Sequence, residues 1–240
     1  KAIIFDLGIS SIQLNDNQRS FSFNSKNDLS MEMGLNKYTA YDIVNNYDKK
    51  YLSKIIKILG EEKDSKKIAN AIIKYREKKP IETSDQLANI IKNAKKNYNS
   101  YKKNPATKTF QAIRIFVNQE LTELILGLIE ASKLLSEGGI LIVISFHSIE
   151  DKIVKNFFRL YSNLKENSSR YLPIKEKNFG LFSLKSKKPL IPGLNEINQN
   201  INSRSAKLRY GIRTNTLFYN SSEFKKKFET FLKLEEGVAW

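Results

Sequence analysis

The first residues with chemical potential follow an apolar run at the start of the chain. Residues 2–6 read AIIFD, and four of the five are small, branched or aromatic apolar types. That composition predicts a strand buried on both faces. A carboxylate that ends a buried strand is costly unless it has a hydrogen-bonding partner. Asp6 is therefore a candidate to accept hydrogen bonds from an amino group of a ligand, and capping of the following turn is the structural alternative.

A second polar cluster follows residues 140–146, ILIVISF, which predict another strand that is apolar on both faces. His147 comes directly after it, and an imidazole titrates near neutrality. A lone histidine in this position is more often a structural hydrogen-bonding group. The G-x-S-x-G pattern of a hydrolase nucleophile elbow is absent, which excludes a serine hydrolase. Ser148 and Asp151 form an S-x-x-D capping box, which predicts a helix that extends to about Tyr161.

A long helix is predicted for residues 106–136 from an apolar stripe with steps of three and four, and a second, polar stripe runs along it. Steps of four, three and four place its members on one face. They are Thr107, Gln111, Arg114 and Asn118. Amides, a hydroxyl and one guanidinium suit hydrogen bonding to a polar ligand or to RNA. A solvated polar face is an equally good interpretation of the stripe alone.

The elements that must position these groups predict an α/β fold. Residues 38–103 contain helix caps, such as Thr39 and the T-x-x-Q box that starts at Thr83, and no strand signals, so they predict an inserted helical domain. The two apolar strands are then joined by a long crossover, which implies parallel neighbours. Parallel neighbours end at the same edge, where open α/β sheets bind ligands. We therefore expect DLGISS and SFHS to lie side by side.

The rest of the chain predicts a smaller set of elements. Residues 162–202 are rich in Asn, Ser, Lys and Pro and predict long loops. Residues 207–213 alternate between apolar and basic types, which predicts an antiparallel strand near a sheet edge. Residues 222–233 predict a terminal amphipathic helix with Phe224, Phe228 and Phe231 on one side.

Charge is the strongest compositional signal. The 240 residues carry 41 basic and 25 acidic groups, a net charge of +16. The excess lies in two blocks, since residues 38–103 hold 16 basic and 8 acidic groups and residues 162–240 hold 15 and 7. This distribution favours a polyanionic partner such as RNA, with two solvated lysine-rich surfaces as the alternative. The absence of cysteine excludes disulfides and thiolate metal sites, and a single histidine excludes a poly-histidine metal site.

The sequence shows no apolar run long enough to span a membrane and no signal peptide, so a cytoplasmic protein without a membrane partner is expected. Five motifs then occur in order: DLGISSIQL, RSFSF, NPATKTFQAIRIFVNQEL, SFHSIEDKIVKNFF and SRSAKLR. Together they resemble the ribosomal RNA small subunit methyltransferase H family, the MraW-like enzymes. The resemblance extends from about residue 2 to residue 214, and residues 215–240 lie beyond it.

The resemblance implies a Rossmann-like class I methyltransferase domain interrupted by a helical domain. It implies methylation of the exocyclic N4 of a cytosine in the decoding region of 16S rRNA, with S-adenosyl-L-methionine as cofactor. The acid and the glutamine of the DLG motif contact the cofactor in the family, and they fall on Asp6 and Gln13 here. The candidate catalytic or base-orienting residues are Asp6, Ser10, Ser145 and His147, with no general base assigned. The expected RNA or substrate contacts are Lys108, Gln111, Arg114, Asn118, Ser148 and Arg204.

The sequence also departs from the family pattern. Ile12 and Asn15 stand where the family has proline and aspartate, and Glu32 replaces an arginine, which places an RNA contact there in doubt. The glycine-rich cofactor loop and the ribose-binding acid precede DLG in the family, so the first βαβαβ half is expected to be missing. We therefore expect an exposed apolar edge at residues 2–6 and weak cofactor binding by an inactive fragment.

These expectations divide the chain into four segments. Residues 1–37 and 104–214 form the two parts of the methyltransferase domain, residues 38–103 form the inserted substrate-recognition domain, and residues 215–240 form a tail helix. Two other function classes stay open: an N-methyltransferase that acts on DNA or protein, and a non-catalytic RNA-binding or ribosome-assembly factor. The oligomeric state is open as well, with a homodimer among the alternatives.

Overall fold

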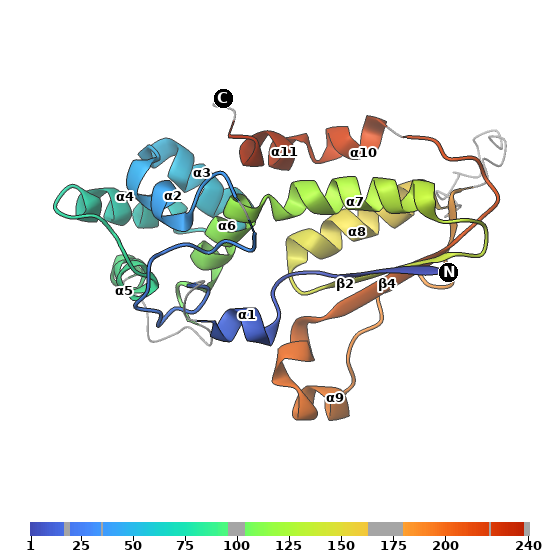
Figure 1. The fold of residues 1–240 in the computed structure, drawn as a ribbon, viewed down its shortest axis with the longest axis horizontal. Coiled ribbons are helices and arrows are strands. Elements are labelled where there is room, and N and C mark those ends of the chain that lie inside the picture. The colour runs from blue at the N-terminus through green and yellow to red at the C-terminus, as the bar shows by residue number, and fades with distance from the viewer. Residues whose placement is uncertain (17–19, 35, 96–103, 163–179, 221, 238–240) are drawn as a thin grey trace, which may run out of the picture. The chain divides into compact units, whose positions relative to one another are not determined.

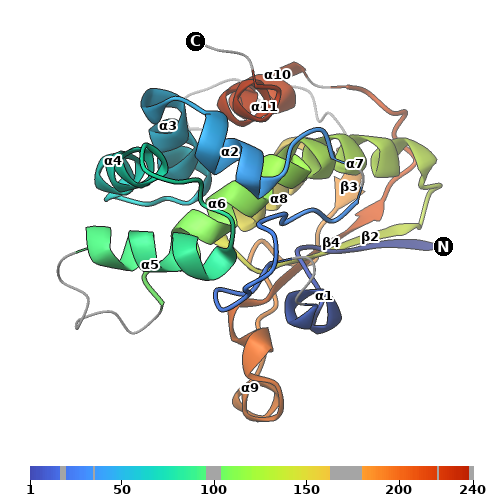
Figure 2. The ribbon, with the colours of Figure 1, turned by 60° about the vertical axis from the view of Figure 1, so that its left-hand side comes forward.

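The computed structural model describes residues 1–16, 20–34, 36–95, 104–162, 180–220 and 222–237 (Figures 1 and 2). The chain forms two compact units. The first comprises Lys1–Gly8 and Glu123–Glu229, and the second comprises Ile9–Thr122 and Thr230–Trp240. No helix among the described residues is long and apolar enough to cross a membrane.

The first unit is built on a four-stranded sheet in the order β1-β2-β4-β3. Its strands are β1 (Ala2–Asp6), β2 (Ile140–Ser145), β3 (Phe182–Ser183) and β4 (Lys207–Arg213). The β1 and β2 strands are parallel, with Asp6 paired to Ile144, so both end at the same edge as predicted. The β4 strand is antiparallel to β2 and to the short β3. The mixed α/β fold class predicted from the sequence is therefore confirmed.

The prediction that β1 is buried on both faces is wrong. Its alternate residues Ala2, Ile4 and Asp6 are exposed, and the Ile4 side chain is 61% exposed. The register places Ile4, Ile142 and Tyr210 on this same face. Burial is confined to the opposite face, because the helices of this unit lie there. In the described structure, β1 is also an edge strand, with β2 as its neighbour.

Helices α7 (Glu120–Leu134) and α8 (Ser148–Tyr161) cover the buried face of the sheet (Figure 1). A Cβ on Gly127 of α7 would lie 3.4 Å from the Phe5 ring, so the helix and β1 are in close contact. Aromatic rings fill the space under α8, with Phe157 in ring contact with Phe158, Phe182 and Phe224. Aromatic pairs of this kind stabilise a core beyond the area that they bury.

The first unit also contains α9 (Leu194–Gln199), η3 (Ile201–Ser205) and α10 (Ser222–Lys227). The terminal helix predicted for residues 222–233 is instead two short helices, α10 and α11 (Glu229–Glu235). Phe224 and Phe228 are buried as the apolar spacing predicts, whereas Phe231 is half-buried.

The second unit is helical. It contains α1 (Ser11–Asn15), α2 (Ala40–Asn46), α3 (Lys49–Leu59), α4 (Ser65–Arg76), α5 (Ser84–Ala94) and α6 (Thr107–Asn118). The predicted caps are confirmed: Thr39 and Thr83 each form a capping box, with Asp42 and Gln86. The helical segment predicted for residues 38–103 lies within this unit.

The long helix predicted for residues 106–136 is divided in two. Gln119 adopts a left-handed conformation with φ 50°, which ends α6, and α7 begins at the next residue. At the other end of α6, Gly60 allows a very close approach, because a Cβ there would lie 2.4 Å from the Lys108 carbonyl oxygen. The turn after Gly60 and the start of α6 are thus in backbone contact.

Candidate functional site

Asp6 ends β1 at the carboxyl edge of the sheet. The main chain continues the parallel pairing for one more residue, since Leu7 N donates to the Ile144 carbonyl at 3.1 Å. The Asp6 side chain is exposed, and none of the described residues hydrogen-bonds or ion-pairs with it. A carboxylate in that state does not cap the following turn and is available to a ligand that carries an amino group.

The loop after β2 begins the next helix in a way that differs from the prediction. The capping box is formed by His147 and Glu150, not by Ser148 and Asp151. Glu150 Oε2 accepts from His147 N at 3.2 Å and from Phe146 N at 2.9 Å. The physical reason is register: the helix starts at Ser148, so His147 is the N-cap and Glu150 the third helical residue.

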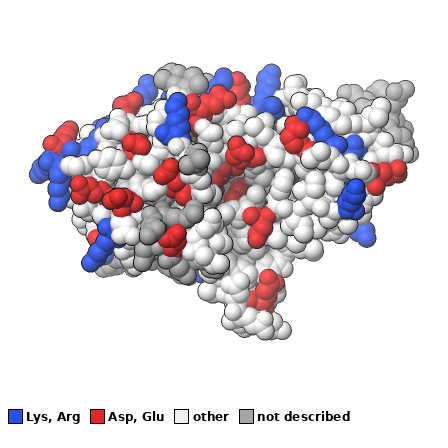
Figure 3. All heavy atoms as spheres, viewed as in Figure 1, with Lys and Arg blue, Asp and Glu red and all other residues white. Residues whose placement is uncertain are grey.

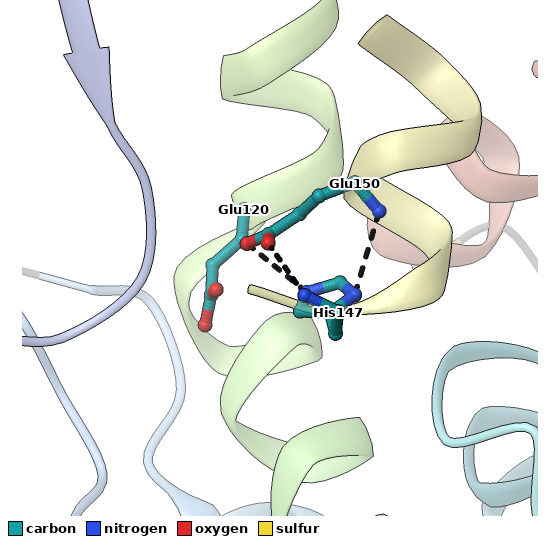
Figure 4. Close-up of side chains that lie close together, drawn as sticks. All are labelled: Glu120, His147 and Glu150. Carbon is teal, nitrogen blue, oxygen red and sulfur yellow. Dashed lines mark hydrogen bonds and ion pairs between the residues drawn. The ribbon is translucent and has the colours of Figure 1, made fainter. Parts of the chain in front are cut away.

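The His147 ring is oriented by the same glutamate (Figure 4). Its Nδ1 accepts from Glu150 N at 3.4 Å, so the proton of the neutral ring belongs on Nε2. Nε2 lies 3.0 Å from Glu150 Oε1, close enough for an ion pair if the ring is charged. The geometry of this contact is not that of a hydrogen bond, and the buried Nε2 atom has no hydrogen-bond partner among the described residues. Ser145, the last residue of β2, is buried and donates to the Lys207 carbonyl at 3.3 Å.

Asp151 is used by β4 instead of the helix cap. Its two carboxylate oxygens accept from Arg209 Nε at 2.7 Å and from Lys207 Nζ at 3.0 Å. Burial alone would raise the pKa of Asp151, but the hydrogen bonds from Arg209 and Lys207 outweigh it and hold the pKa below its ordinary value. This pair of contacts ties α8 to β4, whose first three residues are the end of the SRSAKLR motif.

Ser10 and Gln13 lie in the second unit, where they form the capping box of α1. Ser10 N donates to Gln13 Oε1 at 2.9 Å, and Gln13 N donates to Ser10 Oγ at 3.2 Å. The Gln13 amide oxygen is therefore engaged, while its Nε2 has no hydrogen-bond partner among the residues described. Asp6 belongs to the first unit and Gln13 to the second.

Asn118 holds one loop in place with its whole amide. Its Oδ1 accepts from Met33 N and from Asn36 Nδ2, each at 2.8 Å. Its Nδ2 donates to the carbonyls of Met31 and Arg114, also at 2.8 Å. The loop includes Met31 in a left-handed conformation with φ 59°, which is strained for this residue type. In this structure Asn118 therefore positions Met31, Met33 and Asn36.

The cationic candidates of α6 have protein partners. Arg114 forms a bidentate ion pair with Glu120, at 2.7 Å and 2.9 Å. Lys108 Nζ donates to the Glu61 carbonyl at 2.9 Å but stays exposed. Gln111 is half-buried, and Arg204 is exposed in η3 of the first unit. Ser148, the last expected substrate contact, is the first residue of α8.

Two buried carboxylates of the second unit were not singled out from the sequence. Glu62 pairs with Lys95 at 2.6 Å, and Lys95 Nζ also donates to the Pro105 carbonyl at 3.1 Å. Glu235 accepts from Leu121 N and from Thr122, 114 and 113 residues away. Burial raises the pKa of Glu235 to about 7, against these hydrogen bonds. Neither pairing has a local sequence signal, because each joins residues far apart in the chain.

Taken by itself, the first unit defines an α/β domain with an unpaired carboxylate at the edge where parallel strands end, which is where such sheets bind ligands. Comparison with known proteins identifies the class more closely. The model of the MraW methylase family matches residues 1–213. The chain belongs to this family and its enzyme class is methyltransferase.

Individual relatives agree with the family model. Ribosomal RNA small subunit methyltransferase H of Persephonella marina is 46% identical over 219 residues, which cover 88% of this chain and 67% of the relative. The protein of the same name from Sulfurihydrogenibium sp. is 46% identical over 213 residues, with the same coverage. That of Caldicellulosiruptor saccharolyticus is 45% identical over 212 residues, covering 86% of this chain and 67% of the relative.

Proposed function

We propose that this protein methylates the N4 amino group of a cytosine in 16S rRNA of the small ribosomal subunit, in the cytoplasm, with S-adenosyl-L-methionine as methyl donor. The names of the relatives support the RNA of the small subunit as the substrate. The observation that carries a ligand site is the unpaired Asp6 carboxylate at the carboxyl edge of β1, beside the end of β2.

The residues fit the cofactor in one testable respect. S-adenosylmethionine carries an ammonium group, and the Asp6 carboxylate is exposed and unpaired among the described residues, so it is suited to accept that group's hydrogen bonds. When bound, the cofactor supplies a methyl group that is already activated by its sulfonium. The remaining task of the chain is to hold the cytosine N4 in line, which is catalysis by positioning.

The SFHS loop supplies groups that can orient a base next to Asp6. The His147 ring is held in place by Glu150, and its Nε2 is buried against that carboxylate, so His147 fixes the loop while the exposed Ser148 faces outward to meet a base (Figure 4). A loop that is already fixed loses little freedom when it binds a base. The target cytosine must leave its stack to reach such a site, as bases do in other enzymes that modify them.

The function is tested by transfer of a labelled methyl group from S-adenosylmethionine to three substrates: small ribosomal subunits, free DNA and bulk protein. We expect the protein to label only the small-subunit RNA, at a cytosine N4 identified by mass spectrometry. Labelling of DNA or protein instead would show that the enzyme acts on those substrates and would overturn the assignment to rRNA. RNA binding without any methyl transfer would favour an assembly factor.

The role of Asp6 is tested in the same assay. Asp6→Asn should lower methyl transfer at least tenfold and weaken cofactor binding in a titration. Glu223→Gln removes an exposed carboxylate of α10 and is the matched control, for which we expect unchanged turnover. Normal turnover by the Asp6 variant would remove this residue from the site.

A further inference from the structure

A small cationic hollow lies on the first unit, beside β4. It encloses about 110 Å³ and is lined from α8 by Lys155, Phe158 and Arg159, and from the segment after β3 by Leu184, Ser186 and Lys187. Arg209 and Tyr210 of β4 complete it. Small-molecule sites are several times larger, so this hollow suits one compact group and not a whole cofactor.

The floor of the hollow depends on a glycine. A Cβ on Gly211 would lie 2.8 Å from Phe158 Cε1 and 3.0 Å from Leu184 Cδ2. Because that Cβ is absent, both apolar side chains close against β4 and form a dry base beneath the cations. An apolar base lowers the local dielectric, so a charge that binds above it is attracted more strongly than in open solvent.

The rim carries positive charge that the protein leaves uncompensated. Lys155, Arg159 and Lys187 are exposed, and no carboxylate among the described residues lies within 4 Å of their charged groups. Lys152 shares the exposed face of α8 with Lys155 and Arg159, by its spacing of three and four residues. Three exposed cations from two segments therefore line the hollow, and Lys152 adds charge nearby on the same helix face.

Arg209 is held in a fixed position within this group. Its Nε donates to Asp151 at 2.7 Å and its Nη1 donates to the Lys187 carbonyl at 3.0 Å. Its Nη2 has no partner among the described residues, which leaves one pre-oriented donor pair at the hollow. A fixed guanidinium binds a phosphate oxygen with little loss of side-chain freedom.

We propose that this hollow binds a backbone phosphate of the RNA, separately from the methylation site; the identity of the polyanion rests on the function proposed above. A phosphate group matches the size of the hollow, the positive charge of its rim and the remaining Nη2 donor of Arg209. Lys207, two residues before Arg209, pairs with Ser145 at the end of β2. The hollow thus begins about 7 Å along β4 from the SFHS loop, close enough for both to contact one RNA strand.

The test is the binding of a fluorescent single-stranded RNA oligonucleotide to the full chain, followed by anisotropy over a series of salt concentrations. Lys155→Ala/Lys187→Ala removes one cation from each side of the hollow. Lys225→Ala/Lys226→Ala removes the same charge from exposed positions of α10 and is the matched control. Circular dichroism melting verifies that both variants stay folded. Arg159→Glu is a third variant that reverses one rim charge.

We expect the hollow variant to bind RNA roughly threefold to tenfold more weakly, and its salt slope to fall by about 0.7, the value for one single-strand phosphate. Arg159→Glu should weaken binding further, and the control pair should change it less than twofold. Equal losses in the hollow and control variants, or unchanged binding in the hollow variant, would overturn the proposal. Inorganic phosphate that competes as well as RNA would indicate a site for a free anion instead.

The two proposals fail separately. If the hollow variant methylates small-subunit RNA and binds RNA as well as the unmodified chain does, the phosphate site is rejected and the proposed function stands. If the protein transfers no methyl group but its RNA binding depends on the hollow, the phosphate site stands and the proposed function is rejected.

Discussion

Thr122 holds the Glu235 carboxylate with two hydrogen bonds, from its backbone N at 2.8 Å and from its Oγ1 at 2.5 Å. Leu121 N adds a third at 3.2 Å, so the carboxylate occupies the first turn of α7, where backbone N–H groups have no partner within the helix. Tyr51 Oη donates to the adjacent Leu234 carbonyl at 2.7 Å. These contacts attach α11 to the second unit.

The stability of this attachment should depend on pH. Burial, with a smaller contribution from the nearby Glu120 charge, raises the pKa of Glu235 to about 7, while the hydrogen bonds from Thr122 and Leu121 lower it. The folded chain keeps the proton up to about pH 7, whereas the unfolded chain loses it near 4.5. Stability should therefore fall as pH rises through this window, by up to about 1.4 kcal/mol per pH unit from this group.

Glu235→Gln cannot ionise and should lack this component of the slope. The measurement is the urea midpoint of both proteins between pH 5 and pH 8, with Glu236→Gln, an exposed neighbour, as the control. Parallel stability curves for Glu235→Gln and the unmodified chain would show that the Glu235 pKa is not raised.

Removal of the Asn118 amide should destabilise the second unit. Asn118→Ala leaves Met33 N and the Met31 carbonyl without their partner, which costs about 1–3 kcal/mol. Asn156→Ala removes an exposed amide that makes one hydrogen bond to its own helix and should cost under about 0.5 kcal/mol. Equal costs from denaturant unfolding would contradict the positioning role of Asn118.

A methyl group at Gly60 should be poorly tolerated. The Cβ of Gly60→Ala would meet two backbone carbonyls, of Lys108 at 2.4 Å and of Ile56 at 2.7 Å, so the turn or α6 must shift. Overpacking of this kind costs about 1–3 kcal/mol. Gly193→Ala has open space at its Cβ but occupies the N-cap of α9, where Ala is less favourable than Gly, so it should cost under about 1 kcal/mol. A Gly60 variant that melts at the same temperature as the Gly193 variant would refute the close approach.

The uncovered face of β1 should favour self-association of the chain. Ile4 is 61% exposed on an edge strand, and exposed apolar edges pair with other chains. Ile4→Lys should therefore reduce light scattering at high protein concentration. Leu217→Lys introduces the same charge at a position that is 88% exposed and outside the sheet, and it should have a smaller effect. Equal solubility of both variants would indicate that net charge, and not the edge, decides the behaviour.

Local patterns predicted much of this fold. The parallel β1–β2 pair, the caps at Thr39 and Thr83 and the β4 strand follow from periodicity and cap chemistry within a few residues. The predicted burial of β1 on both faces was wrong, because a continuous apolar run does not show which faces other elements cover. The predicted Ser148–Asp151 capping box was wrong because the helix begins one residue earlier than expected, which makes the adjacent His147 the N-cap.

The candidate site was less predictable than the fold. Asp6 was placed correctly at the sheet edge, because only strand order and direction were needed. The partners of Arg114 and Asn118 were not predicted, since polar side chains on one helix face give no sign of whether solvent, ligand or another segment meets them. The Glu235 contact joins positions more than 100 residues apart and has no counterpart in local sequence.

The buried ammonium of Lys95 makes two distant stretches of the helical unit depend on one pair of charges. It bonds to Glu62 and to the Pro105 carbonyl, so the end of α5 and the residue two positions before α6 share one anchor. Both side chains are buried, and a buried charge is tolerated only while its partner is present. The loss of either side chain therefore leaves the other as an uncompensated charge, so the anchor is kept or lost as a unit.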